Sequence, residues 1–172
     1  HILTGSHDGT SRKFGLRTAR MLKEFRGHGS YVNFCAYQLL SGSNQLLVVT
    51  GSADGTVRLW DGKTSDVVRV LRPMSLGSSL TGAGTSIVVD HQADASAEGG
   101  SPTIHSVLRL HTPPNTMIVV PRGLRAFLVN YSGVVLRVFE DNTAAEKVFV
   151  AAIVSSSNQW LYAVKEDGAC CV

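Results

Sequence analysis

The sequence predicts an all-β fold built from repeated four-stranded antiparallel sheets. Short runs of alternating apolar and polar residues are separated by tight turns, and the clearest turn is Asp54-Gly55 between two such runs. Asp-Gly favours a hairpin because glycine adopts a positive φ without a steric penalty. One pattern returns after 46 residues, and no segment of the sequence shows the apolar period of a helix.

The repeat relates residues 4–10 to residues 50–56. Both stretches read Thr-Gly-Ser, one variable residue, then Asp-Gly-Thr, and Phe14 stands where the second copy has Trp60. A repeat of this length is typical of folds in which each copy forms one sheet and neighbouring sheets bury their faces against each other. The internal repetition is therefore stronger evidence for the fold than any single motif.

We expect one domain, residues 1–172, divided into consecutive units. We expect an incomplete unit at 1–28, a complete unit at 29–74, an insertion at 75–101, a degenerate unit at 102–142 and a second incomplete unit at 143–172. The insertion is rich in Gly, Ser and Ala and has no Lys or Arg, so we expect a flexible loop with a short strand at 87–89. The complete unit should contain strands at 31–37, 46–50, 57–60 and 67–71.

Composition indicates a globular protein with an uneven charge distribution. Hydrophobic residues make up 44% and charged residues 17% of the chain, and the net charge is +3. Residues 1–72 hold ten Lys or Arg against five Asp or Glu, whereas residues 73–172 hold six against eight. A basic half is compatible with an acidic partner or RNA, although arginines on outward-facing strand positions explain it more simply.

Cysteine usage and apolar runs argue against secretion and membrane insertion. Cys35, Cys170 and Cys171 show neither an even number nor a Cys-x-x-Cys spacing, so we expect a reducing compartment. We discount the glycosylation pattern at Asn130 for the same reason. The longest apolar run, residues 148–154, is far shorter than the ~20 residues that a membrane helix needs. We therefore expect no contact with a membrane.

The Gly27-His28 pair, followed at a distance by Trp60-Asp61, resembles the signature of a WD40 propeller blade. The resemblance implies that each unit is one blade, so the chain should form about four blades of a partial β-propeller. An open arc would leave strand edges unpaired, which proteins avoid. We therefore expect these blades to be part of a larger propeller, cut inside a blade at each end. The family resemblance implies that the whole propeller has seven blades.

In regular blades of this family, a buried network of four side chains holds each sheet together. The matching residues here are His28, Thr50, Asp54 and Trp60. Asp54 can accept hydrogen bonds from turn amides and from His28, His28 can bond the Thr50 hydroxyl, and Thr50 can accept from the indole N–H. Histidine, carboxylate and hydroxyl also suit a catalytic triad, but the spacing is that of the structural network.

Further stretches resemble the propeller of the Smu (suppressor of mec and unc) family of spliceosomal WD40 proteins. They include residues 22–33, 53–60 and 159–167. The resemblance implies a nuclear scaffold of pre-mRNA splicing that acts with the Red protein, so the expected partners are spliceosomal proteins. It also implies a helical dimerisation region ahead of the propeller.

We expect the loops on one face of a rigid propeller to bind other proteins. The candidate contact residues flank the inner strand and the Asp-Gly turns: His7, Arg26, Tyr31, Asn33, Ala53 and Arg72. Two other functions stay open. One is a substrate receptor of a ubiquitin ligase, and the other is RNA binding through Arg12, Lys13, Arg17 and Arg20.

We expect no enzymatic activity, no cofactor, no metal and no small-molecule substrate. The glycine-rich stretch 77–84 lacks the Gly-Lys-Ser/Thr ending of a phosphate-binding loop and precedes no helical pattern. Asp90, His91 and Asp94 have no further ligand at a suitable spacing for a metal site. Both stretches are therefore interpreted as solvated loop.

Overall fold

The computed structural model describes residues 1–73, 88–89, 102–140 and 148–172. Within these ranges the chain forms fifteen β-strands and no helix, which confirms the all-β prediction. The strands make four antiparallel sheets, and strands that follow each other along the chain pair within each sheet. In this described part of the chain, there is accordingly no helix that is long and apolar enough to span a membrane.

The first sheet has three strands: β1 (Ile2–Gly5), β2 (Thr10–Phe14) and β3 (Met21–Arg26). The second has five: β4 (Val32–Leu39), β5 (Leu46–Ser52), β6 (Val57–Asp61), β7 (Val67–Leu71) and β8 (Val88–Val89). The third has four: β9 (Ile104–Arg109), β10 (Thr116–Pro121), β11 (Arg125–Asn130) and β12 (Val135–Glu140). The fourth has three: β13 (Phe149–Val154), β14 (Leu161–Lys165) and β15 (Cys170–Cys171).

The second sheet is larger than the four strands that the sequence predicts. Strand β8 pairs with the outer edge of β7, with Val89 opposite Val70 and Val88 opposite Leu71. The short strand expected at 87–89 is thus the fifth strand of this sheet, and the rest of the 75–101 insertion lies outside the described residues. The other sheets each take their strands from one predicted unit, whereas the unit boundaries stay predictions.

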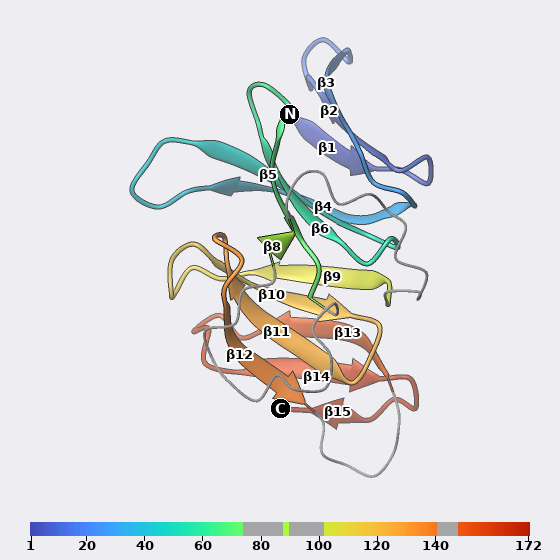
Figure 1. Ribbon diagram of the computed structural model, residues 1–172, viewed down its shortest axis with the longest axis vertical. Helices are drawn as coiled ribbons and strands as arrows, with labels where there is room; N and C mark the ends of the chain where they lie inside the picture. The colour runs from blue at the N-terminus through green and yellow to red at the C-terminus, as the bar shows by residue number, and fades with distance from the viewer. Residues whose placement is uncertain (74–87, 90–101, 141–147) are drawn as a thin grey trace.

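The four sheets lie one above another in chain order, from the N-terminal sheet at the top of Figure 1 to the C-terminal sheet at the bottom. The first strands of the sheets adjoin, because β4 contacts both β1 and β9, and β9 also contacts β13. Among the described strands, no pairing joins the first sheet to the last, so the stack is open. This arrangement brings the turns of neighbouring sheets together at each end of the stack.

The 46-residue repeat produces two turns with the same geometry. In the first turn, the N–H of Ser6 donates to Thr10 O at 3.0 Å, and the equivalent bond 46 residues later measures 3.1 Å. Gly9 and Gly55 both have a φ of 77°. Glycine tolerates this left-handed conformation best, which explains why both turns contain Asp-Gly.

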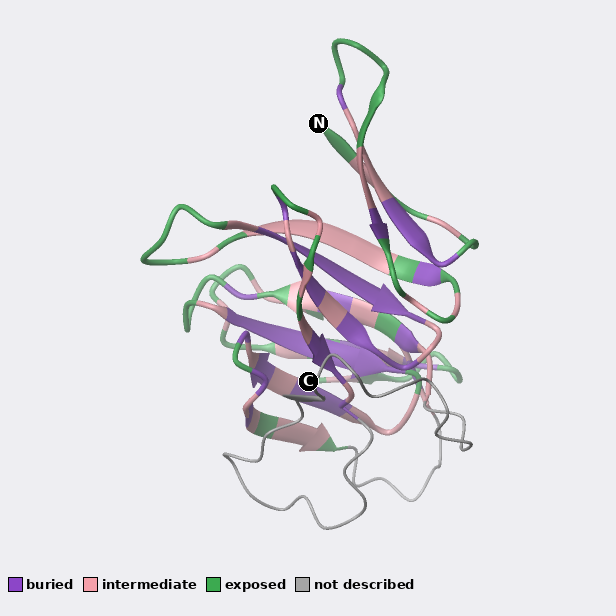
Figure 2. Ribbon diagram, turned by 45° about the horizontal axis from the view of Figure 1, so that its top comes forward, coloured by how far each residue is buried: buried purple, intermediate pink, exposed green. Residues whose placement is uncertain are grey.

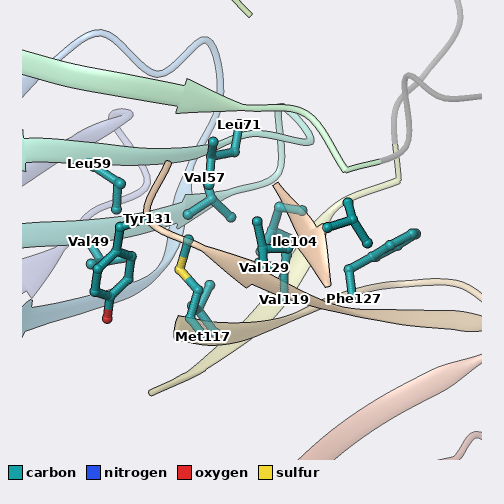
Figure 3. Packing of buried hydrophobic residues seen from close by; sticks show 12 residues of the cluster. Val49, Val57, Leu59, Leu71, Ile104, Met117, Val119, Phe127, Val129 and Tyr131 are labelled. Carbon is teal, nitrogen blue, oxygen red and sulfur yellow. The ribbon is translucent and has the colours of Figure 1, made fainter. Parts of the chain in front are cut away.

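The largest core lies between the second and third sheets, where strands of both contribute side chains (Figure 3). Its buried members include Val49, Leu59, Ile104, Met117 and Phe127. Strand β10 is buried at every position because sheets cover both of its faces. Figure 2 shows this pattern, with buried residues running through the central strands and exposed residues at the turns.

Close packing between these two sheets predicts a large effect for a small change. A Cβ on Gly51 would lie 2.9 Å from Ile104 Cγ2 and 3.4 Å from Val107 Cγ2. We expect Gly51→Ala to lower the free energy of unfolding by about 1–3 kcal/mol, because both neighbours are stiff β-branched side chains. Urea unfolding measures this change. Gly123→Ala is the control, since nothing lies within 4 Å of its Cβ, and equal effects at the two positions would contradict the prediction.

Candidate functional site

The candidate site lies at the end of the first two sheets where β1 turns into β2 and β5 turns into β6. We call it the turn end, and it comprises residues 5–10, 26–33, 52–56 and 72. The N–H of Val32 donates to Ser6 O, and the N–H of Ala53 donates to Tyr31 O, each at 3.0 Å. These bonds join the loops of the two sheets into one continuous surface.

The structure brings His28, Thr50, Asp54 and Trp60 into one chain of hydrogen bonds. His28 Nδ1 lies 3.0 Å from Asp54 Oδ2, and His28 Nε2 lies 2.6 Å from Thr50 Oγ1. The indole N–H of Trp60 donates to the same threonine oxygen at 2.8 Å. The chain therefore connects the β3–β4 segment to β5, β6 and the turn between them.

One arrangement of protons satisfies every member of this network. An ionised Asp54 accepts the Nδ1 proton of His28, which leaves Nε2 to accept the hydroxyl proton of Thr50. The Thr50 oxygen then accepts the indole N–H. Thr50 is fully buried and the His28 side chain is 1% exposed. The Thr50 hydroxyl is already hydrogen-bonded and is shielded from solvent. The geometry therefore favours a role in holding the sheet together over a role as a catalytic nucleophile.

Asp54 also holds the turn in which it lies. Its Oδ2 accepts the N–H of Gly29 at 2.9 Å, and its Oδ1 accepts the N–H and the hydroxyl of Thr56 at 2.9 and 2.6 Å. Burial raises the pKa of Asp54, but the hydrogen bonds from His28, Thr56 and Gly29 outweigh burial and hold this pKa well below its usual value. The carboxylate is therefore ionised near neutral pH.

In the first sheet, Asp8 takes part in a chain of ion pairs. Asp8 Oδ1 accepts the N–H and the hydroxyl of Thr10 at 3.0 and 2.6 Å. Arg12 Nη2 lies 2.7 Å from Asp8 Oδ2, and Arg12 Nε lies 3.0 Å from Glu24 Oε1. Hydrogen bonds from Thr10 and Arg12 hold the pKa of Asp8 well below its usual value. The sequence analysis missed this chain, although Arg12 and Glu24 are cross-strand partners.

Two of the predicted contact residues, His7 and Tyr31, form an aromatic pair at the turn end. Their rings are stacked, with centroids 5.4 Å apart and an interplanar angle of 6°. His7 is exposed and Tyr31 is 40% exposed. His7 lies in the β1–β2 turn of the first sheet and Tyr31 directly before β4 of the second, so the pair connects the two sheets. Flat aromatic surface of this kind is enriched in protein interfaces, because it buries a large area at a small cost in side-chain entropy.

The other four predicted contact residues also lie at the turn end. Arg26 is exposed. Asn33 is exposed too, but its Nδ2–H donates to Ile104 O at 3.0 Å, so this amide also connects the second sheet to the third. Ala53 and Arg72 are partly buried. The structure thus gathers all six predicted residues at one end, where their exposure differs.

No group of three or more His, Cys, Asp or Glu side chains is placed to hold a metal ion among the residues that the structure describes. The sequence analysis had rejected a metal cluster at Asp90, His91 and Asp94 and a phosphate loop at 77–84. Both stretches lie outside the described residues.

Two asparagines at the opposite end of the sheets were not singled out from the sequence. Asn115 and Asn158 both have a φ of 56°. Asn115 Oδ1 accepts the N–H of Ser41 at 2.8 Å, and Asn115 Nδ2 donates to Ser41 O at 3.3 Å. With its amide oriented to satisfy both groups, Asn158 accepts the N–H of His111 at 3.3 Å and of Thr112 at 3.2 Å. Each asparagine braces its sheet against the preceding one.

Residues 19–61 match the family model described as WD domain, G-beta repeat. The chain contains a WD40 repeat. The matched segment includes strands β3 to β6 and all four members of the His28–Asp54 network. The four stacked antiparallel sheets are consistent with the predicted partial WD40 propeller, and WD40 repeats mediate contacts between proteins.

Curated relatives match the WD40 chain to different extents. The WD40 repeat-containing protein smu1 of Dictyostelium discoideum is 28% identical over 145 residues, which cover 84% of this chain and 22% of that protein. THO complex subunit 6 of Arabidopsis thaliana is 30% identical over 79 residues, covering 46% of this chain and 20% of the relative. A ribosome biogenesis protein WDR12 homolog of Trichoplax adhaerens is 42% identical over 60 residues, which cover 35% of this chain and 13% of that protein.

The first of these matches confirms the resemblance to Smu proteins on which the sequence analysis drew. The chain spans only about a fifth of the length of that relative, and no more of the other two. The names of the other two refer to different functions, the THO complex and ribosome biogenesis. The similarity therefore supports a protein-interaction scaffold in general, because one fold carries many functions.

Proposed function

We propose that this chain is part of a non-catalytic scaffold of nuclear pre-mRNA splicing, which binds spliceosomal proteins and acts with a Red-type partner. The observation that carries the proposal is the similarity to smu1 along 84% of the chain. The other two relatives match half of the chain or less. The nuclear location follows from this proposed process.

The turn end is the proposed contact surface. The buried network of His28 and Asp54 holds the loops in place from below, so they need little reordering when a partner binds. At the same end, the stacked rings of His7 and Tyr31 offer an apolar anchor, and the exposed Arg26, which pairs with Glu24, adds a polar group. A rigid aromatic anchor with a polar rim is the usual composition of an interaction hot spot.

The RNA-binding alternative has less support from the side chains. Arg12 is paired with Asp8 and Glu24, and Lys13 Nζ lies 5.7 Å from the centre of the Tyr37 ring. Of the four predicted RNA contacts, Arg17 and Arg20 are exposed. A substrate receptor of a ubiquitin ligase would bind its partners through the same turn end. The identity of the captured proteins therefore decides between a ubiquitin-ligase receptor and a splicing scaffold.

We expect the double variant His7→Ala with Tyr31→Ala to capture at least about tenfold less of its partners than the wild type, because a hot-spot aromatic residue contributes about 2 kcal/mol or more to binding. Tagged protein is incubated with nuclear extract, and bound splicing factors are quantified by mass spectrometry. The melting temperature should change little, since both side chains are at the surface.

Leu16→Ala is the matched control, because Leu16 is 66% exposed and lies in the β2–β3 turn, outside the turn end. It should capture partners as the wild type does. Equal capture by the folded double variant would exclude this face as the contact surface. Recovery of ubiquitin-ligase subunits in place of splicing factors would overturn the splicing proposal.

A further inference from the structure

Arg58 on β6 carries a guanidinium group that the network does not use. The side chain lies over the ring of Trp60, with Cζ 5.9 Å from the ring centre. Its Nε is buried without a hydrogen-bond partner, and its guanidinium forms no ion pair with the residues that the structure describes. A cation that is partly removed from water and not compensated is costly unless something else supplies an acceptor.

The negative charge of Asp54 compensates Arg58 only in part. Burial is the main cause that lowers the pKa of Arg58; the charge of Asp54 raises this pKa, and the smaller effect of Arg72 lowers it. Both carboxylate oxygens of Asp54 already accept hydrogen bonds from His28, Gly29 and Thr56. Asp54 therefore attracts Arg58 through its charge without supplying a hydrogen-bond acceptor to the buried Nε.

The backbone leaves room for this guanidinium at the turn end. A Cβ on Gly27 would lie 2.6 Å from Arg58 Nη1 and 3.3 Å from Trp60 Cη2, and Gly27 has a φ of 151°. The next residue towards the N-terminus is Arg26, whose side chain is 70% exposed and whose Nε lies 2.7 Å from Glu24 Oε2. The guanidinium of Arg58 thus packs against the backbone at Gly27, at the rim of the proposed contact surface.

We propose that Arg58 binds a carboxylate side chain in an acidic segment of the partner protein. The proposal rests on the interaction function proposed above and specifies the chemistry of the partner. A planar guanidinium can bind a carboxylate through two parallel hydrogen bonds, which suits a fixed position such as this one. The excess of basic residues in 1–72 supplies the charge complementarity that would attract an acidic segment.

A fluorescein-labelled hexaglutamate peptide tests the proposal by fluorescence anisotropy with the purified protein. We expect Arg58→Met to weaken binding about tenfold or more, because it removes the fork but keeps an apolar chain over Trp60. Arg17→Met is the matched control, since Arg17 is exposed in the β2–β3 turn, and should change the affinity by less than about twofold. The melting temperature of Arg58→Met should not fall, because the incompletely compensated cation is gone.

Several outcomes would overturn this inference. Unchanged binding by Arg58→Met, or an equal loss with Arg17→Met, would leave only a diffuse attraction to the basic half of the protein. Binding of a bis-phosphorylated serine peptide or of polyuridine, without binding of hexaglutamate, would assign the site to a different ligand class. By contrast, intact hexaglutamate binding by the His7–Tyr31 double variant would support the inference, whether or not that variant loses its partners, because the peptide assay does not depend on identified partners.

Discussion

Replacing Trp60 by Ala is expected to lower the free energy of unfolding by about 3–5 kcal/mol, the range for a fully buried aromatic residue. Trp60 is 1% exposed and its ring meets Phe25 of the first sheet edge-on, with centroids 5.9 Å apart. The substitution leaves a cavity between two blades and removes the donor to Thr50 Oγ1. Equilibrium unfolding in urea measures the change.

The chain provides its own control for this experiment, because its second tryptophan, Trp160, is 56% exposed. We expect Trp160→Ala to change the free energy of unfolding by no more than about 0.5–1 kcal/mol. Each variant also leaves a single tryptophan, so fluorescence reports separately on the second and the fourth sheet. A similar loss of stability in the two variants would show that the Trp60 network does not support the blade.

Replacing Asp54 by Ala is expected to cost about 2–4 kcal/mol at pH 7, because it leaves several partly buried donors without an acceptor. These donors are the Nδ1–H of His28, the N–H of Gly29, and the N–H and hydroxyl of Thr56. Asp66→Ala is the control, because Asp66 is exposed in the β6–β7 turn. It should change stability by less than about 0.5 kcal/mol.

The contribution of Asp54 should also depend on pH. The pKa of Asp54 in the folded protein is lower than the value of about 3.9 expected in the unfolded chain. A carboxylate of this kind contributes its full stability above the unfolded pKa and loses it as the pH falls towards the folded pKa. The difference in unfolding free energy between wild type and Asp54→Ala should therefore be constant from pH 7 to about 5 and shrink below about pH 4. A difference that grows on acidification would contradict this.

The turns and the network could be predicted because their signals are local or repeat along the chain. Asp54-Gly55 specifies a turn through the conformational freedom of glycine, and the same dipeptide 46 residues earlier has the same φ. The network follows from the family pattern, since His28, Thr50, Asp54 and Trp60 occur at the spacing of a regular WD40 blade. The hydrogen bonds between them agree with the bonding that the pattern implies.

The contact residues could be predicted from the sequence only as separate positions, without the contacts that their side chains make. Nothing in the spacing of His7 and Tyr31 shows that their rings stack, because the contact depends on how the first sheet lies against the second. The bond from Asn33 to Ile104 spans 71 residues and likewise depends on the packing of the second sheet against the third. The pairing of β8 with β7 was not predicted either, since two valines within a glycine-rich insertion do not indicate which strand edge they join.

The sequence alone determined that this chain is a series of antiparallel sheets, one of which holds the buried network of a WD40 repeat, since turn chemistry and repeat spacing act over short distances. Only the tertiary structure decided which polar groups remain uncompensated. Arg58 follows the turn in an ordinary strand, and its sequence position does not distinguish it from other strand arginines. It becomes a candidate binding residue because Gly27 and Trp60 lie against it in the folded protein, where partial burial makes an unpaired charge costly.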